Sequence, residues 1–487
     1  MNLTPLLGDG WLQALLPELI LCVGGMLLIL IDAFAPKARG VLSALAVIIF
    51  VATSWAERLT AFSAGDYFGG MYQISAITIV FDMTFLLAAI LATLFAGDYL
   101  QREGIDAGEF YALLMWGTVG LMMMAKGLDL LVVILGLELV SICIFILVGF
   151  HRRLVVANEA SLKYFLMGAF ATGFILYGTA LLYGATQSTN FAVMGKWFEA
   201  NGSAPTPILT VAFVLLMAGL GFKLALAPFH GWAPDVYQGA PSPVAGWLSV
   251  APKAATLIAL VRIFVAMGPM LPHVSWMKMV AALSVLSMIV GNAVAIVQRD
   301  LKRMLAYSGI AHVGYMMIAM LTMRDDSVAA IAVYTMVYAL MNIGAFGVVS
   351  LLAKNQNDPQ TLDDIAGLFW RRPFYGFAMT VCMFSLSGLP PTAGFMSKFY
   401  IFKNAIESGH TGIALTGIIT SIVSVYYYLR VVYFMFMKEA TDATPATIGG
   451  IFATGALAIS VLGIIGFGLF PTPLFNVAGQ AAQALFP

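Results

Sequence analysis

Stretches of about 20 apolar residues recur along the whole chain, and they constrain its fold more than any other feature, because each is long enough to cross a bilayer as a helix. Of the 487 residues, 61% are hydrophobic and only 10% are charged. A soluble domain carries about 25% charged residues, so the composition excludes a large soluble domain and predicts an all-α polytopic membrane protein. The formal net charge is +0, and no basic patch indicates nucleic acid as a partner.

The apolar stretches predict about 14 transmembrane helices. They lie at 12–34, 40–56, 74–96, 110–125, 128–150, 158–185, 207–229, 243–266, 276–298, 302–321, 327–353, 374–397, 411–437 and 448–470.

Basic residues in the connections predict the orientation, because cytoplasmic loops are enriched in Lys and Arg. With the N-terminus outside, twelve basic residues fall in inside connections and six in outside ones, so both termini are predicted on the outer side. The inside residues are Lys37, Arg39, Arg102, Arg152, Arg153, Arg299, Lys302, Arg303, Lys354, Arg371, Arg372 and Lys438, and the outside ones are Arg58, Lys126, Lys196, Lys278, Arg324 and Lys403.

Two of the predicted helices are interrupted by proline. Lys223 lies in the first, in GFKLALAPFHGWAPDVYQGAPSPVAG, and Pro390 and Pro391 interrupt the second, in SLSGLPPTAGFMSK. A lysine at mid-bilayer costs roughly 2.5–3.5 kcal/mol on insertion scales, and a broken helix frees backbone groups that lipid cannot satisfy. A charge beside a broken helix indicates an ion or proton path.

The two interruptions are five segments apart, which is the pattern of an internal structural repeat. We predict a single transmembrane domain, 1–487, that contains two inverted five-helix repeats, each with a broken helix. Residues 110–266 form the first repeat and 276–437 the second. Residues 1–109 hold three peripheral helices, and 448–487 hold the last helix and the tail.

Glu138 lies in a strongly apolar segment, so it must pair with another helix or stay neutral. Lys223 is the expected partner, and a purely structural ion pair is the alternative. Lys253 follows Pro252 in segment eight and is a second candidate amine. For Lys163, a surface pair with Glu159 four residues earlier is an equally good interpretation.

His312, in segment ten, titrates near neutral pH and is a candidate proton relay, although a lone core histidine is the commoner case. His230 follows Lys223 by seven residues and is expected to face the same cavity. Lys398 follows the second break and is expected in the half-helix after it.

Other charged or reactive residues in apolar segments are assigned structural roles. Arg262 and Arg430 are expected to extend to the membrane edge, whereas the carboxylates of segments one to three are expected to serve packing. The three cysteines are far apart, so no disulfide or metal site is predicted, and no His/Cys cluster indicates haem or an iron–sulfur centre. These residues are Glu18, Asp32, Asp82, Cys22, Cys143 and Cys382.

Several long runs resemble the antiporter-like membrane subunits of NADH-quinone oxidoreductase, respiratory complex I. These runs are GFKLALAPFHGWAPDVYQGAPSPVAG, SVAPKAA, AYSGIAHVGY and SGLPPTAGFMSKF, together with an intramembrane glutamate in segment five. The resemblance covers essentially the whole chain. The run EASLKYFLMGAFATGFILYG, the phrase PDVYQGAPSPV and a lysine at position 398 resemble subunit N in particular.

The resemblance implies a proton-translocating subunit without a redox centre of its own, in a bacterial inner membrane. NAD, FMN, iron–sulfur clusters and quinone are then expected in partner subunits, with other complex I membrane subunits and lipids as partners. In this interpretation Glu138 and Lys223 form a coupling pair, Lys253 and His312 continue a hydrated axis, Lys398 leads outwards, and Lys163 is the subunit N variant on segment six.

Two other functions remain open from the residues alone. A subunit of a cation/proton antiporter would need the same lysines and breaks, and it predicts sodium-dependent proton flux without NADH. A purely structural membrane subunit would use the charges only to hold helices together.

Overall fold

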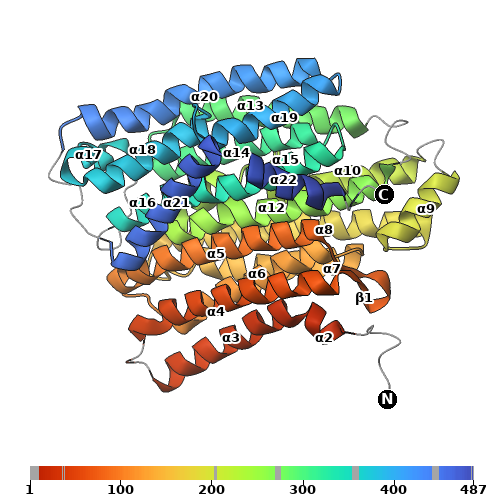
Figure 1. Cartoon of the computed structure of the whole chain (residues 1–487), viewed down its shortest axis with the longest axis horizontal. Helices are drawn as coiled ribbons and strands as arrows, with labels where there is room; N and C mark the ends of the chain where they lie inside the picture. Colours follow the sequence, from red (N-terminus) through yellow and green to blue (C-terminus); the bar gives the residue numbers. More distant parts are fainter. Residues whose placement is uncertain are drawn as a thin grey trace.

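Long helices lie side by side and make up most of the molecule (Figure 1). The computed structural model describes residues 10–35, 37, 39–201, 206–268, 276–353, 361–440, 449–483 and 485. Within these ranges, twelve helices are long and apolar enough to cross a membrane. The prediction of an all-α polytopic membrane protein is therefore confirmed. Lys354 and residue 448, both used in the predictions, lie outside the described residues.

The helices follow the predicted segments in chain order. The first six segments form α2 (Trp11–Ala14) with α3 (Leu16–Phe34), α4 (Arg39–Thr60), α5 (Ala76–Glu103), α6 (Gly108–Lys126), α7 (Leu130–Val148) and α8 (Val155–Thr186). After the surface helix α9 (Phe191–Asn201) come α10 (Pro207–Leu224), α11 (Ala233–Gly239), α12 (Ser242–Ala266), α13 (Trp276–Val297), α14 (Leu301–Ala319), α15 (Asp325–Tyr338) and α16 (Gly344–Leu352). The chain ends with α17 (Leu368–Arg371), α18 (Pro373–Ser387), α19 (Ala393–Glu407), α20 (Thr411–Met437), α21 (Ile451–Leu469) and α22 (Thr472–Gln483).

The predicted count of fourteen spans stays a prediction. Segment 302–321 forms α14, whose serine, histidine and lysine side chains make it less apolar than the twelve helices above. Segment 374–397 is two short helices, α18 and part of α19, rather than one span. The sequence also did not predict a small hairpin, in which β1 (Gly65–Tyr67) pairs antiparallel with β2 (Tyr72–Ile74).

Both predicted interruptions are present. Helix α10 ends at Leu224, and Ala225 has a φ of 57°, so the chain leaves the helix directly after Lys223. Helix α18 ends at Ser387, and Gly388 has a φ of 83° before the two prolines and α19. Each half of the chain therefore contains one interrupted helix, and each interruption has a lysine within about two helical turns.

The two halves also begin corresponding helices in the same way. Asp129 precedes α7 and accepts a hydrogen bond from the backbone N–H of Leu131. Asp300 precedes α14 and accepts one from the N–H of Arg303. Side-chain caps of this kind satisfy the free N–H groups at a helix start. Helices α7 and α14 are the segments predicted to correspond in the two repeats.

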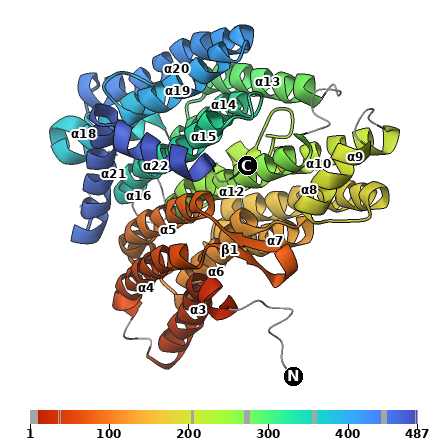
Figure 2. The same cartoon turned by 45° about the vertical axis from the view of Figure 1, so that its right-hand side comes forward.

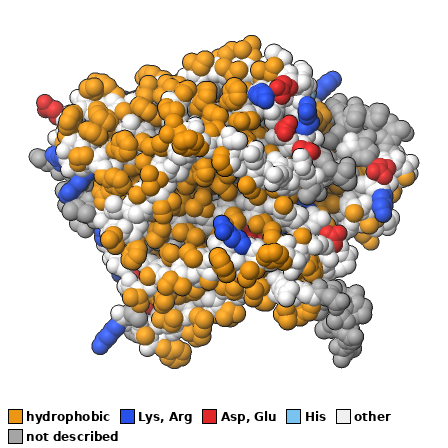
Figure 3. Space-filling model, in the orientation of Figure 1, with side chains coloured by type: hydrophobic (Ala, Val, Ile, Leu, Met, Phe, Trp, Pro, Cys, Tyr) orange, Lys and Arg blue, Asp and Glu red, His pale blue; other side chains and the backbone are white. Residues whose placement is uncertain are grey.

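Helix α12 lies in the middle of the molecule, with the first half of the chain on one side and the second half on the other (Figure 2). Almost all its residues are buried. Its neighbour, the α15–α16 helix, is equally buried and contains a π-helical segment, η5 (Ala339–Ile343). Outer helices such as α8 and α20 instead expose apolar side chains, and the visible surface is mostly hydrophobic between its two ends (Figure 3). This is the surface that a helix bundle in lipid requires.

Candidate functional site

Lys223 lies in the last turn of α10 and is buried. Its ammonium donates a hydrogen bond to the hydroxyl of Ser141 on α7, at 2.7 Å, and lies 5.7 Å from the ring centre of Phe145. Ser141 in turn donates to the carbonyl of Leu137. No carboxylate of the described residues lies within ion-pair distance of this lysine, so a hydroxyl rather than a charge holds it.

Glu138 lies on α7 three residues before Ser141 and is half-buried. Its carboxylate accepts a hydrogen bond from Thr172 of α8, at 2.7 Å. The predicted partners Glu138 and Lys223 are thus on facing helices but do not form a contact ion pair. Ser141, about one helical turn after Glu138, is the α7 residue that contacts Lys223.

Lys253 lies on the central helix α12 and is 2% exposed. Its ammonium donates to the carbonyl of Gly309 on α14, at 3.2 Å, and lies 5.8 Å from the ring centre of Tyr237. A Cβ on Gly309 would stand 3.0 Å from the Lys253 nitrogen and 3.0 Å from the Tyr338 hydroxyl. Lys253 and Tyr338 therefore face the same small space beside Gly309.

His312, one turn further along α14, is surrounded by tyrosines. Its Nδ1 is 2.7 Å from the hydroxyl of Tyr334, and its Nε2 is 3.1 Å from that of Tyr428. The ring of Tyr338 lies 5.0 Å from the histidine ring, and that of Tyr315 lies 5.8 Å away. Hydroxyl groups on both ring nitrogens make His312 able to accept a proton on one side and release one on the other.

Lys398 lies on α19 and reaches back to the end of α18. Its ammonium donates to the carbonyls of Leu386 and Ser387, each at 3.0 Å, and to the hydroxyl of Ser421 at 2.9 Å. It also lies 5.1 Å from the ring centre of Tyr315. A cation at the C-terminal carbonyls of a helix is favoured by the helix dipole, so the interruption of the helix creates the binding position for this lysine.

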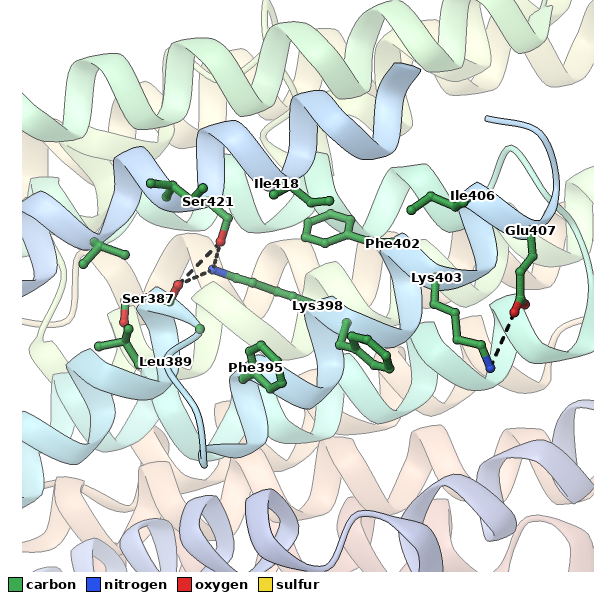
Figure 4. A pocket seen from close by; sticks show the side chains of 14 residues that line it. Ser387, Leu389, Phe395, Lys398, Phe402, Lys403, Ile406, Glu407, Ile418 and Ser421 are labelled. Atoms are coloured by element: carbon green, nitrogen blue, oxygen red, sulfur yellow. Dashed lines mark hydrogen bonds and ion pairs between the residues drawn. The ribbon is translucent and has the colours of Figure 1, made fainter. Parts of the chain in front are cut away.

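The amine of Lys398 also faces a cleft of about 540 Å³ between α19 and α20 (Figure 4). Apolar side chains form most of the lining, including Phe395, Phe402 and Ile418. Lys403 and Glu407 lie at the far end, where their side chains are 3.7 Å apart and about half exposed. Lys398 therefore lines a cleft that reaches the exposed side chains of Lys403 and Glu407.

Ring contacts connect these groups into one series. We define the buried row as Lys223, Lys253, His312 and Lys398. Lys253 and His312 meet at Tyr338, and His312 and Lys398 meet at Tyr315. Between Lys223 and Lys253 the ring contacts run through Phe145, Tyr164, Trp232 and Tyr237.

Two predicted candidates lie apart from the row. Lys163 is 44% exposed and pairs with Glu159 at 2.7 Å and with Asp235 at 3.1 Å. Asp235 also pairs with Arg303 at 2.6 Å. Partial burial opposes ionisation of Asp235, but the hydrogen bonds from Arg303 and Lys163 outweigh it and lower the pKa of this carboxyl. The predicted pair of Lys163 with Glu159 is therefore present, and a role of Lys163 in proton transfer stays a prediction.

His230 is half-buried in the loop after α10, with its ring 6.2 Å from that of Tyr307 on α14. Its Nδ1 is buried without a hydrogen-bond partner. No contact joins this histidine to Lys223 in the described residues, and the expectation that both face one cavity stays a prediction.

The sequence reasoning missed the tyrosines that line the row. A tyrosine in an apolar helix is usually a packing residue. Only the contacts of these tyrosines with the lysines and His312 indicate that they belong to the site. Their ring positions were not visible as a motif, because they come from four different helices. They are Tyr237, Tyr315, Tyr334, Tyr338 and Tyr428.

Two basic residues that were predicted near the membrane surface are buried in the protein. Lys126 was assigned to an outside connection, but it is the last residue of α6 and is 0% exposed. Arg262 was expected to extend to the membrane edge; it lies four residues before the end of α12, is 3% exposed and donates to Gln73 of β2. Lys126 is buried because three carboxylates surround it, and two of them, Glu18 and Asp82, were expected to serve only packing.

Comparisons with known proteins agree with this arrangement. A family model described as NADH:quinone oxidoreductase/Mrp antiporter, TM, matches residues 127–424. NADH-quinone oxidoreductase subunit N of Trichlorobacter lovleyi is 40% identical over 97% of this chain and 97% of its own length. Subunit N of Chloroflexus aggregans is also 40% identical, over 97% of this chain and 98% of its own.

Solved structures are similar as well. A chain of respiratory complex I from Thermus thermophilus with bound aureothin has a TM-score of 0.81 and 33% identity, covering 95% of this chain and 99% of its own. A chain of the Mrp complex from Dietzia sp. DQ12-45-1b has a TM-score of 0.85, with 98% of both chains covered. It is 18% identical, so that likeness concerns the fold alone.

Proposed function

This chain belongs to the subunit N family of NADH-quinone oxidoreductase, and from that premise we propose that it is a proton-translocating membrane subunit of the enzyme. The three lysines of the buried row carry the proposal. Each is at most 6% exposed, and no carboxylate of the described part of the chain lies within ion-pair distance of any of them. Burying an ammonium without a counter-charge costs free energy. These lysines are therefore better explained as groups that gain and lose a proton than as members of fixed ion pairs.

The proposed route enters from the inner side towards Lys223 and Lys253. It continues through the tyrosines around His312 to Lys398 and leaves through the outer part of the molecule. At each step a proton passes from an ammonium or imidazolium nitrogen to a water molecule or to a hydroxyl that releases its own proton to the next acceptor, and the donor becomes neutral. The hydroxyl contacts of His312 and of Lys398 support this order.

Glu138 is the proposed switch for Lys223. The two are on facing helices without a direct contact, so a charge change at Glu138 acts on Lys223 through space. Moving one proton against 100 mV costs about 2.3 kcal/mol. That energy must come from redox chemistry elsewhere in the complex, because the proposal assigns no redox centre to this chain.

The same premise extends to the surroundings. We infer that NAD, FMN, iron–sulfur clusters and quinone bind partner subunits, and that the neighbours are other complex I membrane subunits and lipids. We place the chain in a bacterial inner membrane with both termini on the outer side. We also retain two inverted repeats, 110–266 and 276–437, since each contains one interrupted helix.

The test replaces Lys223 by alanine in the assembled complex, reconstituted in proteoliposomes. Lys196→Ala is the matched control, because Lys196 is an exposed lysine on α9, away from the row. We expect Lys223→Ala to lose most proton pumping per electron, at least several-fold, and Lys196→Ala to keep it. An unchanged proton-to-electron ratio in the assembled Lys223→Ala complex contradicts the proposal.

The antiporter alternative is supported by the family model, whose description names both classes. It predicts sodium-dependent proton flux in vesicles that contain this chain but receive no NADH. Relatives named subunit N, at 40% identity over nearly the whole chain, favour the complex I function instead.

A further inference from the structure

Among the described residues, Lys126 has the largest number of ion-pair contacts, and it lies outside the buried row. The ammonium of Lys126, at the end of α6, is 2.8 Å from Glu18 of α3, 3.0 Å from Glu57 of α4 and 2.9 Å from Asp82 of α5. The side chains of Lys126, Glu57 and Asp82 are 0% exposed, and that of Glu18 is 6% exposed. We call these four residues the Lys126 cluster.

The charges of the Lys126 cluster do not balance. One ammonium faces three carboxyl groups, so full ionisation would leave two negative charges buried among four helices. The ammonium donates hydrogen bonds to Glu18 and Glu57 and contacts Asp82 as an ion pair. One oxygen of Glu18, one of Glu57 and both of Asp82 remain buried without a hydrogen-bond donor. Such a group of buried acceptors costs several kcal/mol unless a proton is added.

Glu57 and Asp82 are placed to share that proton. Both contact the same ammonium within 3.0 Å, and one oxygen of Glu57 and both oxygens of Asp82 have no hydrogen-bond donor. Two ionised carboxylates are acceptors only, so neither can donate to the other. One added proton supplies an O–H donor at this place and removes one excess negative charge.

A second buried cation lies beside the β1–β2 hairpin. Arg262 of α12 is 3% exposed, and its Nε and Nη2 have no hydrogen-bond partner. Its Nη1 donates to Gln73 of β2 at 3.3 Å, and Gln73 donates to Asp66 of β1 at 3.0 Å. Arg262 is on the helix that carries Lys253, nine residues earlier, so α12 connects the hairpin with the row.

The β1–β2 hairpin covers the cluster. The hydroxyl of Tyr72, on β2, donates to Glu18 at 2.6 Å, and the backbone of Met71 accepts from the N–H of Leu128 at 2.8 Å. Tyr72 also pairs with Gly127, directly after Lys126. The cluster lies where α3 and α5 begin and α4 and α6 end, so it is near one face of the molecule rather than at mid-depth.

We propose that the Lys126 cluster is a proton-binding site, separate from the buried row, in which Glu57 and Asp82 share one proton beneath the β1–β2 hairpin. Loading forms an O–H bond on one of these carboxyl groups with a proton from water, and release reverses that step without any change of oxidation state. The ammonium already occupies the centre of the carboxylates, and no metal-holding group of His, Cys, Asp or Glu occurs in the described residues. The occupant is therefore a proton rather than a metal ion.

The test is infrared spectroscopy of the purified, assembled complex, in the region of the carboxylic acid C=O stretch, in H₂O and in D₂O. We expect the wild type to show a deuterium-sensitive acid band that Glu57→Gln/Asp82→Asn lacks, equivalent to one carboxylic acid per chain. The double variant keeps Lys126 with Glu18 as a neutral pair and is expected to assemble. The control Glu159→Gln, which changes an exposed carboxylate, keeps the band.

A single variant, Glu57→Gln, gives the same readout with fewer changes, should the double variant not assemble. Spectra of these variants that superpose on the wild type would show that all three carboxyl groups are ionised, and they would overturn the proposal. Because the band is measured without turnover, this result is independent of whether Lys223→Ala affects pumping.

Discussion

At the scale of single residues, the chain buries lysines in two different ways. Lys126 is surrounded by three carboxylates, whereas Lys223, Lys253 and Lys398 are held by hydroxyls, backbone carbonyls and aromatic rings. A fixed charge needs a strong counter-charge. A lysine that loses and regains its proton needs partners that can hydrogen-bond to both its charged and its neutral form. A hydroxyl can do so, because it both accepts and donates hydrogen bonds.

Gly309 gives a sharp test of the contact between Lys253 and Tyr338. A methyl group there would stand 3.0 Å from both the lysine nitrogen and the tyrosine hydroxyl, which are the flexible ends of their side chains. We expect Gly309→Ala to assemble, because alanine favours the helix by about 1 kcal/mol, but to lower pumping several-fold. Gly173→Ala on α8 is the control, since its Cβ would meet nothing within 4 Å. Equal pumping by both variants would argue against a passage beside Gly309.

Asp106, in the loop between α5 and α6, predicts a pH effect on stability. Burial raises the pKa of Asp106 to about 6, against an opposing hydrogen bond from Tyr111. The folded state then holds a proton that the unfolded state releases near its pKa of 3.8. Stability is therefore highest at low pH and is lost as pH rises through about 6. We expect Asp106→Asn to raise the thermal midpoint of the detergent-purified chain at pH 8 and to change it little at about pH 4, near the pKa of the unfolded state. The same increase at both pH values would contradict this assignment.

At the scale of elements, the interrupted helices position two lysines in opposite ways. Lys223 lies in the last turn before its break, and Lys398 lies after its break but returns to the carbonyls of the preceding half-helix. The second arrangement depends on Gly388, whose φ of 83° turns the chain and whose missing side chain leaves room for Lys398.

A comparison of two glycines can distinguish the effect of backbone strain from the effect of contact with Lys398. Gly388 and Gly409 both have a φ of 83°, but a Cβ at Gly388 would lie 3.0 Å from Lys398 Cδ, whereas one at Gly409 would meet nothing within 4 Å. An alanine costs about 1–2 kcal/mol at either position. We expect both variants to lower the thermal midpoint, and only Gly388→Ala to lower proton pumping per electron. A matching loss of pumping in Gly409→Ala would assign the effect to strain alone.

The helix breaks and the row were predictable because their causes are local. Proline and glycine prevent a helix from continuing, and a lysine in an apolar run is visible in the sequence. The Lys126 cluster was not predictable, because Lys126 follows an apolar run as a loop residue would, and its partners Glu18 and Glu57 are 108 and 69 residues away. The tyrosines around His312 were hidden for the same reason, since they come from three helices that only packing brings together.

At the scale of the whole molecule, the central position of α12 brings the charged groups of both halves together. Helices α7 and α10 supply Glu138 and Lys223 from one side, and α14 and α19 supply His312 and Lys398 from the other. Lys253, on α12, lies between them, and the aromatic contacts of the row meet there. A protein that only anchored partners would not require this continuous series across its interior.

Lys253 therefore offers the most direct test of the central claim, because its loss breaks no ion pair and removes only one hydrogen bond to a backbone carbonyl. The measurement is the number of protons pumped per electron by assembled Lys253→Met complex in proteoliposomes, beside the exposed control Lys196→Ala. The buried row predicts normal assembly with at least a several-fold loss of pumping in Lys253→Met and no loss in the control. Normal assembly with an unchanged proton-to-electron ratio would contradict it.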